Sequence, residues 1–293
     1  MAGCATTETV YNTNSHADTV SVVNGATFRI IETIPVGQRP VAIVVNAQRT
    51  HVYTANSGSN TVSVISTASN GVIATVAVGA RPFGVDVNRA GTLVYVSNSE
   101  GNTISVIDTA TNTVAATVAV GEGPTGVAIN HAGSHLYLTN QLSHSVSVIS
   151  VATNTVTATI PVGRRPMALA VNRAGSRVYV VNNASDTVSV IDTATNTVLS
   201  TVQVGIGPIG VAIDPSDAFV YVANQRGNSV SVITAVNNAI TATLAAGEGP
   251  TGLVVNRAGT LVYVVNKLAD TLSVISTATN TIDATIREGG SPQ

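Results

Sequence analysis

Short apolar runs and polar turns alternate along the whole chain. In one stretch, four runs of strand length follow one another, at 83–88, 93–98, 103–108 and 114–120. Each run is rich in Val, Ile, Thr and Tyr and is bounded by Gly, Asn, Asp or Pro, which is typical of β-strands and their turns. No helical period competes with this pattern. The sequence therefore predicts units of four antiparallel strands, named A to D in chain order.

A Tyr-x-x-Asn motif recurs in the second strand of every unit, always 42 residues after the previous copy. The copies start at Tyr11, Tyr53, Tyr95, Tyr137, Tyr179, Tyr221 and Tyr263. Four-stranded units at this period, repeated seven times, predict an all-β fold, a seven-bladed β-propeller. Because Tyr and Asn are unchanged in all copies, we interpret them as structural: the tyrosine fills the space between blades and the asparagine caps strand B.

The constant phase of the repeat predicts one domain, residues 1–293. The expected blades are approximately 1–37, 38–79, 80–121, 122–163, 164–205, 206–247 and 248–293. Blade one is unusual, because its strand A would come from residues 1–4, which are poor in β-branched side chains. We expect that strand to be short or absent, or residues 289–293 to help cover the gap. Blades one and seven should meet directly, without exchange of a full strand.

The repeats resemble a known family. Residues 95–98, 179–182 and 221–224 read Tyr-Val-x-Asn, and Val-Ile-Asp follows at 106–108 and 190–192. These motifs are similar to YVTN-type β-propeller repeats, and the resemblance spans essentially the whole chain. It implies an extracytoplasmic location, in the periplasm or at the cell surface, and does not imply an enzyme. In four copies a hydroxyl residue replaces the aspartate, a departure that affects turns: Ser66, Ser150, Thr234 and Ser276.

Composition narrows the choice of partners. Hydrophobic residues make up 44% of the chain and charged residues 10%, which favours a compact fold throughout. A net charge of -2, without basic runs interleaved with aromatics, gives no general attraction for nucleic acid. No apolar run approaches the roughly 18 residues needed to cross a bilayer. Cys4 follows Ala-Gly in an ending that resembles a bacterial lipobox, which predicts a lipid anchor as the only link to a membrane; an ordinary chain start is the alternative.

One rim of the predicted ring varies between copies. It is formed by the D-to-A and B-to-C connections, whereas the A-to-B and C-to-D turns of the other rim are uniform. Divergence within a regular repeat can encode a binding surface without disturbing the scaffold, although exposed loops can also drift freely. We interpret this rim and the channel mouth as the candidate working face. Its D-to-A loops carry Arg39, Arg81, Glu122, Arg164, Arg165, Ile206 and Glu248, and its B-to-C loops carry His16, Glu100, His144, Arg226 and Lys267.

The arginines of this rim are candidate ligands for a carboxylate or phosphate, because a guanidinium binds such groups through forked hydrogen bonds. Arg39, Arg81 and Arg165 share the position directly before a proline, close to the expected central opening. The alternative is that these arginines form ordinary surface ion pairs with Glu122 and Glu248, worth under about 1 kcal/mol each.

The other ionisable residues give weaker indications of a binding site than the rim arginines do. Asp86 is the one acid within a recognisable strand A, and we expect it to face the water-filled channel, because burying an unpaired carboxylate is costly. His131 and His135 bracket one turn, but two ligands are fewer than a zinc site needs. His16 and His144 should lie on opposite sides of the ring. No metal site or cofactor is predicted, and a divalent metal at the channel mouth stays open.

The sequence contains no phosphate-cradling glycine loop, no Gly-x-Ser-x-Gly, no Cys-His pair and no haem-attachment motif. We therefore favour a monomeric, non-catalytic binding or interaction propeller of the cell envelope. Its expected partner is a protein, a glycan or a small anionic ligand. One alternative is a lactonase- or lyase-like propeller enzyme with its site over the central channel. Another is a surface-layer or adhesive structural module.

Overall fold

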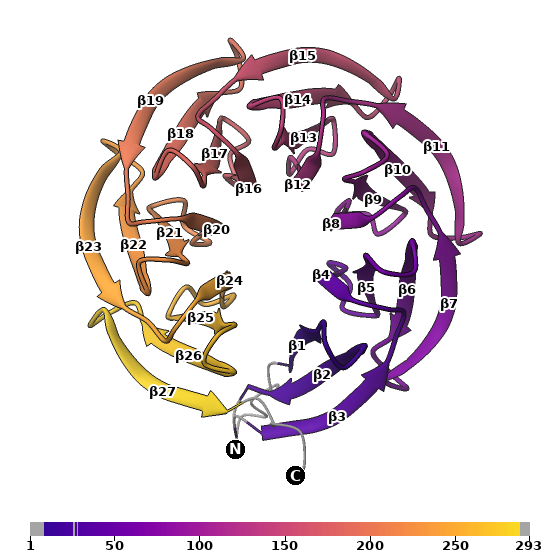
Figure 1. The fold of residues 1–293 in the computed structure, drawn as a ribbon, viewed down its shortest axis with the longest axis horizontal. Helices are drawn as coiled ribbons and strands as arrows, with labels where there is room; N and C mark the ends of the chain where they lie inside the picture. The colour runs from indigo at the N-terminus through magenta and orange to yellow at the C-terminus, as the bar shows by residue number, and fades with distance from the viewer. Residues whose placement is uncertain (1–8, 26, 28, 288–293) are drawn as a thin grey trace, which may run out of the picture.

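The computed structural model describes residues 9–25, 27 and 29–287. Cys4 and the expected ring closure by residues 1–4 and 289–293 lie outside the described residues. Within them, all regular structure is β-strand, and seven antiparallel sheets form a ring around a central axis, where the sequence predicts the channel (Figure 1). The prediction of a seven-bladed β-propeller is confirmed. No helix of the described part could span a membrane.

The blades share one strand order, from the channel outward. The innermost strands A are β4 (Pro40–Val45), β8 (Pro82–Val87), β12 (Pro124–Ile129), β16 (Pro166–Val171), β20 (Pro208–Ile213) and β24 (Pro250–Val255). Strands B are β1 (Thr9–Asn14), β5 (His51–Asn56), β9 (Leu93–Asn98), β13 (His135–Asn140), β17 (Arg177–Asn182), β21 (Phe219–Asn224) and β25 (Leu261–Asn266). Strands C are β2 (Thr19–Asn24), β6 (Thr61–Ser66), β10 (Thr103–Asp108), β14 (Ser145–Ser150), β18 (Thr187–Asp192), β22 (Ser229–Thr234) and β26 (Thr271–Ser276). Strands D are β3 (Arg29–Pro35), β7 (Gly71–Ala77), β11 (Thr113–Ala119), β15 (Thr155–Pro161), β19 (Thr197–Gln203), β23 (Ala239–Ala245) and β27 (Thr281–Arg287).

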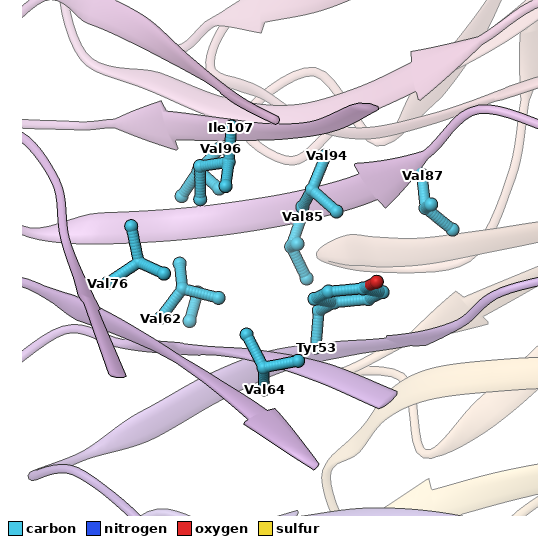
Figure 2. Packing of buried hydrophobic residues seen from close by; sticks show 10 residues of the cluster. Tyr53, Val62, Val64, Val76, Val85, Val87, Val94, Val96 and Ile107 are labelled. Carbon is cyan, nitrogen blue, oxygen red and sulfur yellow. The ribbon is translucent and has the colours of Figure 1, made fainter. Parts of the chain in front are cut away.

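The core lies between the blades. Strands B and C are buried on both faces because a neighbouring sheet packs on each side, whereas strands D are largely exposed. Figure 2 shows one such layer, in which Tyr53 and Val64 of blade two face Val85 and Val94 of blade three. Tyr95, for example, is only 1% exposed. The prediction that the repeated tyrosine fills the space between blades is confirmed.

The repeated asparagine ties strand B to strand C. In blade three, Asn98 Nδ2 donates to Thr103 Oγ1 at 3.0 Å and to Ser105 Oγ at 2.9 Å. The same pair of bonds recurs in the other blades, for example from Asn182. These bonds confirm the expected capping role of the asparagine side chain.

Close approach of the innermost strands sets how tightly the ring closes. A Cβ added to Gly84 would lie 2.2 Å from the Thr125 carbonyl oxygen of the next blade, which is far inside van der Waals contact. A Cβ added to Gly210 would lie equally close, 2.2 Å, to the Thr251 carbonyl oxygen. Glycine is needed at these two positions, because the next backbone occupies the place of a side chain, whereas blades two and five carry Ala42 and Ala168 at the same place.

Candidate functional site

The predicted working face has a repeated backbone lock. The residue before proline in each D-to-A loop donates its N–H to a B-to-C loop of the preceding blade, as Arg81 N does to Asn60 Oδ1 at 2.8 Å. Its carbonyl accepts from the B-to-C loop of its own blade, as Arg81 O does from Ser99 N at 2.9 Å. Both loop sets therefore lie on the same rim, as expected, and each lock joins two blades.

The residue in this lock has a left-handed backbone. Arg39, Arg81 and Arg165 have φ values of 52°, 53° and 53°. The other three described blades with this loop have glycine at the same place, with φ values of 63° to 66°. A left-handed conformation costs a non-glycine residue roughly 1–2 kcal/mol, and the following proline restricts it further. Three arginines thus occupy a position where glycine would be less costly.

The choice between arginine and glycine follows from the neighbouring B-to-C loop. A Cβ at Gly123 would lie 2.8 Å from Leu142 Cγ, and one at Gly207 would lie 2.6 Å from Arg226 Nε. Blades two to seven therefore each project a long side chain from this place, and blade three projects two, because Glu100 lies opposite Arg81. We call this set the loop ring, and it comprises Arg39, Arg81, Leu142, Arg165, Arg226 and Leu268.

The loop ring is amphipathic and open to solvent. Leu142 and Leu268 are 60% and 69% exposed. The four arginines of the ring are all exposed, as is the adjacent Arg164. Sequence reasoning selected the arginines but missed both leucines, because their pairing with glycine appears only when two loops are seen side by side.

Ion pairs engage part of this rim. Arg81 Nη1 lies 3.0 Å from Glu100 Oε1, and Arg226 Nη2 lies 3.7 Å from Asp186 Oδ1. Within the described residues, Arg39, Arg164 and Arg165 form no ion pair, and neither do the two glutamates proposed as their partners. Those exposed glutamates instead hold the leucine loops through their backbone carbonyls: Glu122 O accepts from Leu142 N and Glu248 O accepts from Leu268 N, both at 3.1 Å.

The two histidines of the rim lie far apart. His144 takes the locking position in blade four that Asx residues take elsewhere, with Nδ1 3.2 Å from Arg165 N and 3.1 Å from Gln141 O. His16 is exposed in blade one, across the ring (Figure 1). They cannot contribute to one site.

Asp86 links the innermost strands of blades three and four and stays partly exposed. Its carboxylate accepts from Val87 N and from Ile129 N of blade four, both at 2.8 Å. Side chains of a strand project normal to the sheet, so an innermost strand turns its backbone edge to the axis and its side chains to the neighbouring blades. Burial raises the pKa of Asp86 to about 6, and the two N–H donors oppose that rise.

Tyr95 is the cross-strand neighbour of Asp86. Burial, together with the negative charge of Asp86, raises the pKa of Tyr95 to about 12. Its hydroxyl is buried and has no hydrogen-bond partner among the described residues. Tyr95 therefore stays protonated and buried beside the carboxylate of Asp86.

His131 and His135, which bracket one turn, contact different residues. His131 Nε2 contacts Arg89 Nη1 of the preceding blade, whereas His135 Nδ1 lies 3.0 Å from Ser134 Oγ. In the part of the chain that the structure describes, no group of three or more His, Cys, Asp or Glu could hold a metal ion.

Two clefts open on the opposite rim, which sequence reasoning treated as uniform. One of about 260 Å³ lies between blades two and three, and one of about 420 Å³ lies between blades five and six. The sequence does indicate variation on this rim, because the first residue of strand B differs between copies. Blades two to seven carry His51, Leu93, His135, Arg177, Phe219 and Leu261 at this position.

Comparison with protein families gives two partial matches. Residues 127–233 match the YNCE-like beta-propeller family, and residues 75–159 match the family of lactonase, 7-bladed beta-propeller. The matches support a β-propeller family. Neither is specific to the YVTN-type repeat, and each covers less than half of the chain. Comparison with curated proteins gives no match.

Solved structures share the architecture. Hydrazine synthase of Kuenenia stuttgartiensis is 22% identical, with a TM-score of 0.84 and 92% of both chains covered. A functionally unknown protein from Desulfotomaculum acetoxidans is 14% identical, with a TM-score of 0.85 and 95% of both chains covered. At such low identity these similarities show the fold alone.

Proposed function

We propose that this protein is a non-catalytic binding propeller of the cell envelope, whose loop ring holds an anionic group of a partner. The observation that carries the proposal is the backbone of Arg39, Arg81 and Arg165. Each keeps a left-handed conformation that glycine adopts in other blades. A strained residue held in place by its surroundings points to a use for its side chain.

The side chains support an anionic partner. Arg39 lies in blade two beside Arg81 in blade three, while Arg164 and Arg165 form a second group in blade five. A guanidinium offers a planar fork of donors that matches a carboxylate or phosphate. The exposed Leu142 and Leu268 add apolar contact between the charged groups, as at many interfaces. A protein, glycan or small molecule with carboxylate or phosphate groups has this chemistry.

Glycine substitution separates binding from stability. The triple variant Arg39→Gly, Arg81→Gly and Arg165→Gly gives these blades the residue that blades four, six and seven already carry. We expect the wild type to bind polygalacturonate or polyphosphate with an affinity that falls as salt rises, and the variant to lose that binding. Its melting temperature should stay the same or rise, because the left-handed strain is removed.

Arg49→Gly is the matched control. Arg49 also has a left-handed backbone, with φ 57°, but it lies in an A-to-B turn on the opposite rim. This variant should keep full binding. Equal binding by the triple variant and the wild type, or failure of the wild type to bind either polymer at low salt, would contradict the proposal.

The envelope location has its own test. We propose that Cys4 carries a lipid anchor, supported by its resemblance to a lipobox and by the YVTN-like repeats. Expressed from the full gene in a bacterial host, the wild type should appear in the membrane fraction and gain the mass of a lipid. Cys4→Ser should appear in the soluble extracytoplasmic fraction. Unmodified Cys4 in the wild type would refute the anchor.

A further inference from the structure

The cleft between blades five and six lies where the repeat breaks. The A-to-B turn of blade six reads Asp-Pro-Ser-Asp at 214–217, where blades three, five and seven read Asn-Arg-Ala-Gly. Its C-to-D turn reads Ala-Val-Asn-Asn at 235–238, where the same blades read Thr-Ala-Thr-Asn. A site on a symmetric scaffold requires such local departures. Both departures meet at one cleft.

A threonine found in other blades is absent at the cleft between blades five and six. In blade five, Thr193 Oγ1 donates to Gly175 O at 2.7 Å and ties the C-to-D turn to the A-to-B turn. Thr109 and Thr277 make the same tie in blades three and seven. Ala235 takes this position in blade six and lacks the hydroxyl and methyl groups that fill the space. The cleft has a volume of about 420 Å³, which is within the usual range for a small-ligand site.

Two charged side chains line the cleft, Arg177 from blade five and Asp217 from blade six, and other groups hold both in place. Arg177 Nη1 donates to Asp192 Oδ2 at 2.7 Å and to Ser176 O at 2.8 Å. Among the described residues, the Nε and Nη2 donors of Arg177 have no partner. Asp217 accepts backbone N–H groups through both oxygens, from Arg173 at 2.8 Å and Ala174 at 2.9 Å. The guanidinium and the carboxylate are therefore held in place before any ligand arrives.

Blade six also contributes apolar side chains to the lining. Phe219 is 40% exposed and Val236 is 90% exposed, and Ala218 and Ala235 also line the cleft. Exposed apolar side chains next to fixed polar groups are the usual composition of a small-ligand pocket.

The charge balance selects the class of ligand. The guanidinium of Arg177 is paired with Asp192, and the carboxylate of Asp217 is stabilised by two backbone donors. An anion would meet the carboxylate of Asp217, and a cation would meet the guanidinium of Arg177, since both line the cleft. A neutral ligand with several hydroxyl groups and one C–H face suits both the polar and the apolar side chains of the lining. We propose that this cleft binds a pyranose unit of a glycan, with its hydroxyls on Arg177 and Asp217 and its C–H face on Phe219 and Val236.

Two variants test the site without removing the fold. Ala235→Thr restores the residue of other blades and fills the cleft. Arg177→Leu recreates a pair that the protein already contains, because Leu93 lies opposite Asp108 in blade three as Arg177 lies opposite Asp192. Binding of methyl glucoside, galactoside, mannoside and N-acetylglucosaminide is measured by ligand-observed NMR and calorimetry, with methyl glucuronoside as an anionic comparator.

We expect at least one neutral glycoside to bind the wild type, and each variant to weaken it about tenfold or more. His51→Leu, in the cleft between blades two and three, is the matched control and should change nothing. The proposal is overturned if no neutral glycoside binds at millimolar concentration, if only the glucuronoside binds, or if Ala235→Thr binds as well as the wild type. The arginine-to-glycine triple variant should keep this binding, which makes the cleft separable from the loop ring.

Discussion

At the scale of single residues, identical side chains build this molecule and exceptional ones carry its candidate chemistry. The repeated Tyr and Asn are buried structural groups, as their recurrence in every copy indicated. Asp86 is the one acid among the described strands A, and its ionisation affects the stability of the fold. Its partner Ile129 lies 43 residues away in the next blade, so the sequence could show that Asp86 is unusual but not what it bonds.

Asp86 should make stability depend on pH. Its folded pKa, about 6, lies above the ordinary value of 3.8. The folded protein therefore binds the proton more tightly, so the stabilising effect is complete below about pH 3.8 and is lost as pH rises through about 6. Relative to Asp86→Asn, the wild type should lose up to about 3 kcal/mol of unfolding free energy between these limits. Urea unfolding at several pH values measures the difference.

Asp192 supplies the control of opposite sign. Backbone donors, led by Thr195, lower the pKa of this carboxyl group. Its stabilising effect is present above the ordinary pKa and is lost as pH falls, so Asp192→Asn should change the profile in the other direction. A parallel profile for the wild type and Asp86→Asn would contradict the assignment of Asp86.

At the scale of elements, strand A is the strand whose structure the sequence predicted least completely. Its existence and its proline start were predictable from composition. Its orientation was not, because a strand at the edge of the channel turns its backbone, and not its side chains, to the axis. The left-handed residue before each proline was also hidden, since Arg39 and Gly123 look unrelated until the Leu142 loop is placed beside the glycine.

Gly210 tests how tightly the innermost strands pack. Gly210→Ala would place a methyl group against the Thr251 carbonyl, which belongs to a backbone that cannot rotate away. We expect a loss of about 1–3 kcal/mol or more, measured by thermal or urea unfolding. Gly71→Ala at the start of β7 is the control, because its nearest contact would be an ordinary 3.5 Å from Ser69 Oγ. A similar small effect at both positions would mean that adjacent blades can separate without cost.

At the scale of the whole molecule, the two candidate sites lie on opposite rims. Regularity made the fold predictable, because a constant period, four strands per repeat and a buried tyrosine leave few other architectures. The sites were less predictable. The loop ring and the cleft at Arg177 both depend on contacts between loops of different strands or blades, and a pattern within one repeat does not show which exceptions meet in space.

The shared layers between blades should make the ring unfold as one unit. Tyr53 packs between blades two and three, and Tyr179 packs between blades five and six. Each change to alanine should cost about 3–5 kcal/mol, because a large buried side chain is removed. The sites lie in different layers, so the two costs should add within about 0.5 kcal/mol in the double variant, provided that every blade unfolds in the same transition. Calorimetry should then show one transition for all four proteins.

Tyr53→Phe and Tyr179→Phe keep the aromatic ring, so these controls should lose little stability. Two separate transitions in either single variant would instead indicate that blades unfold independently, as nearest-neighbour repeat arrays do.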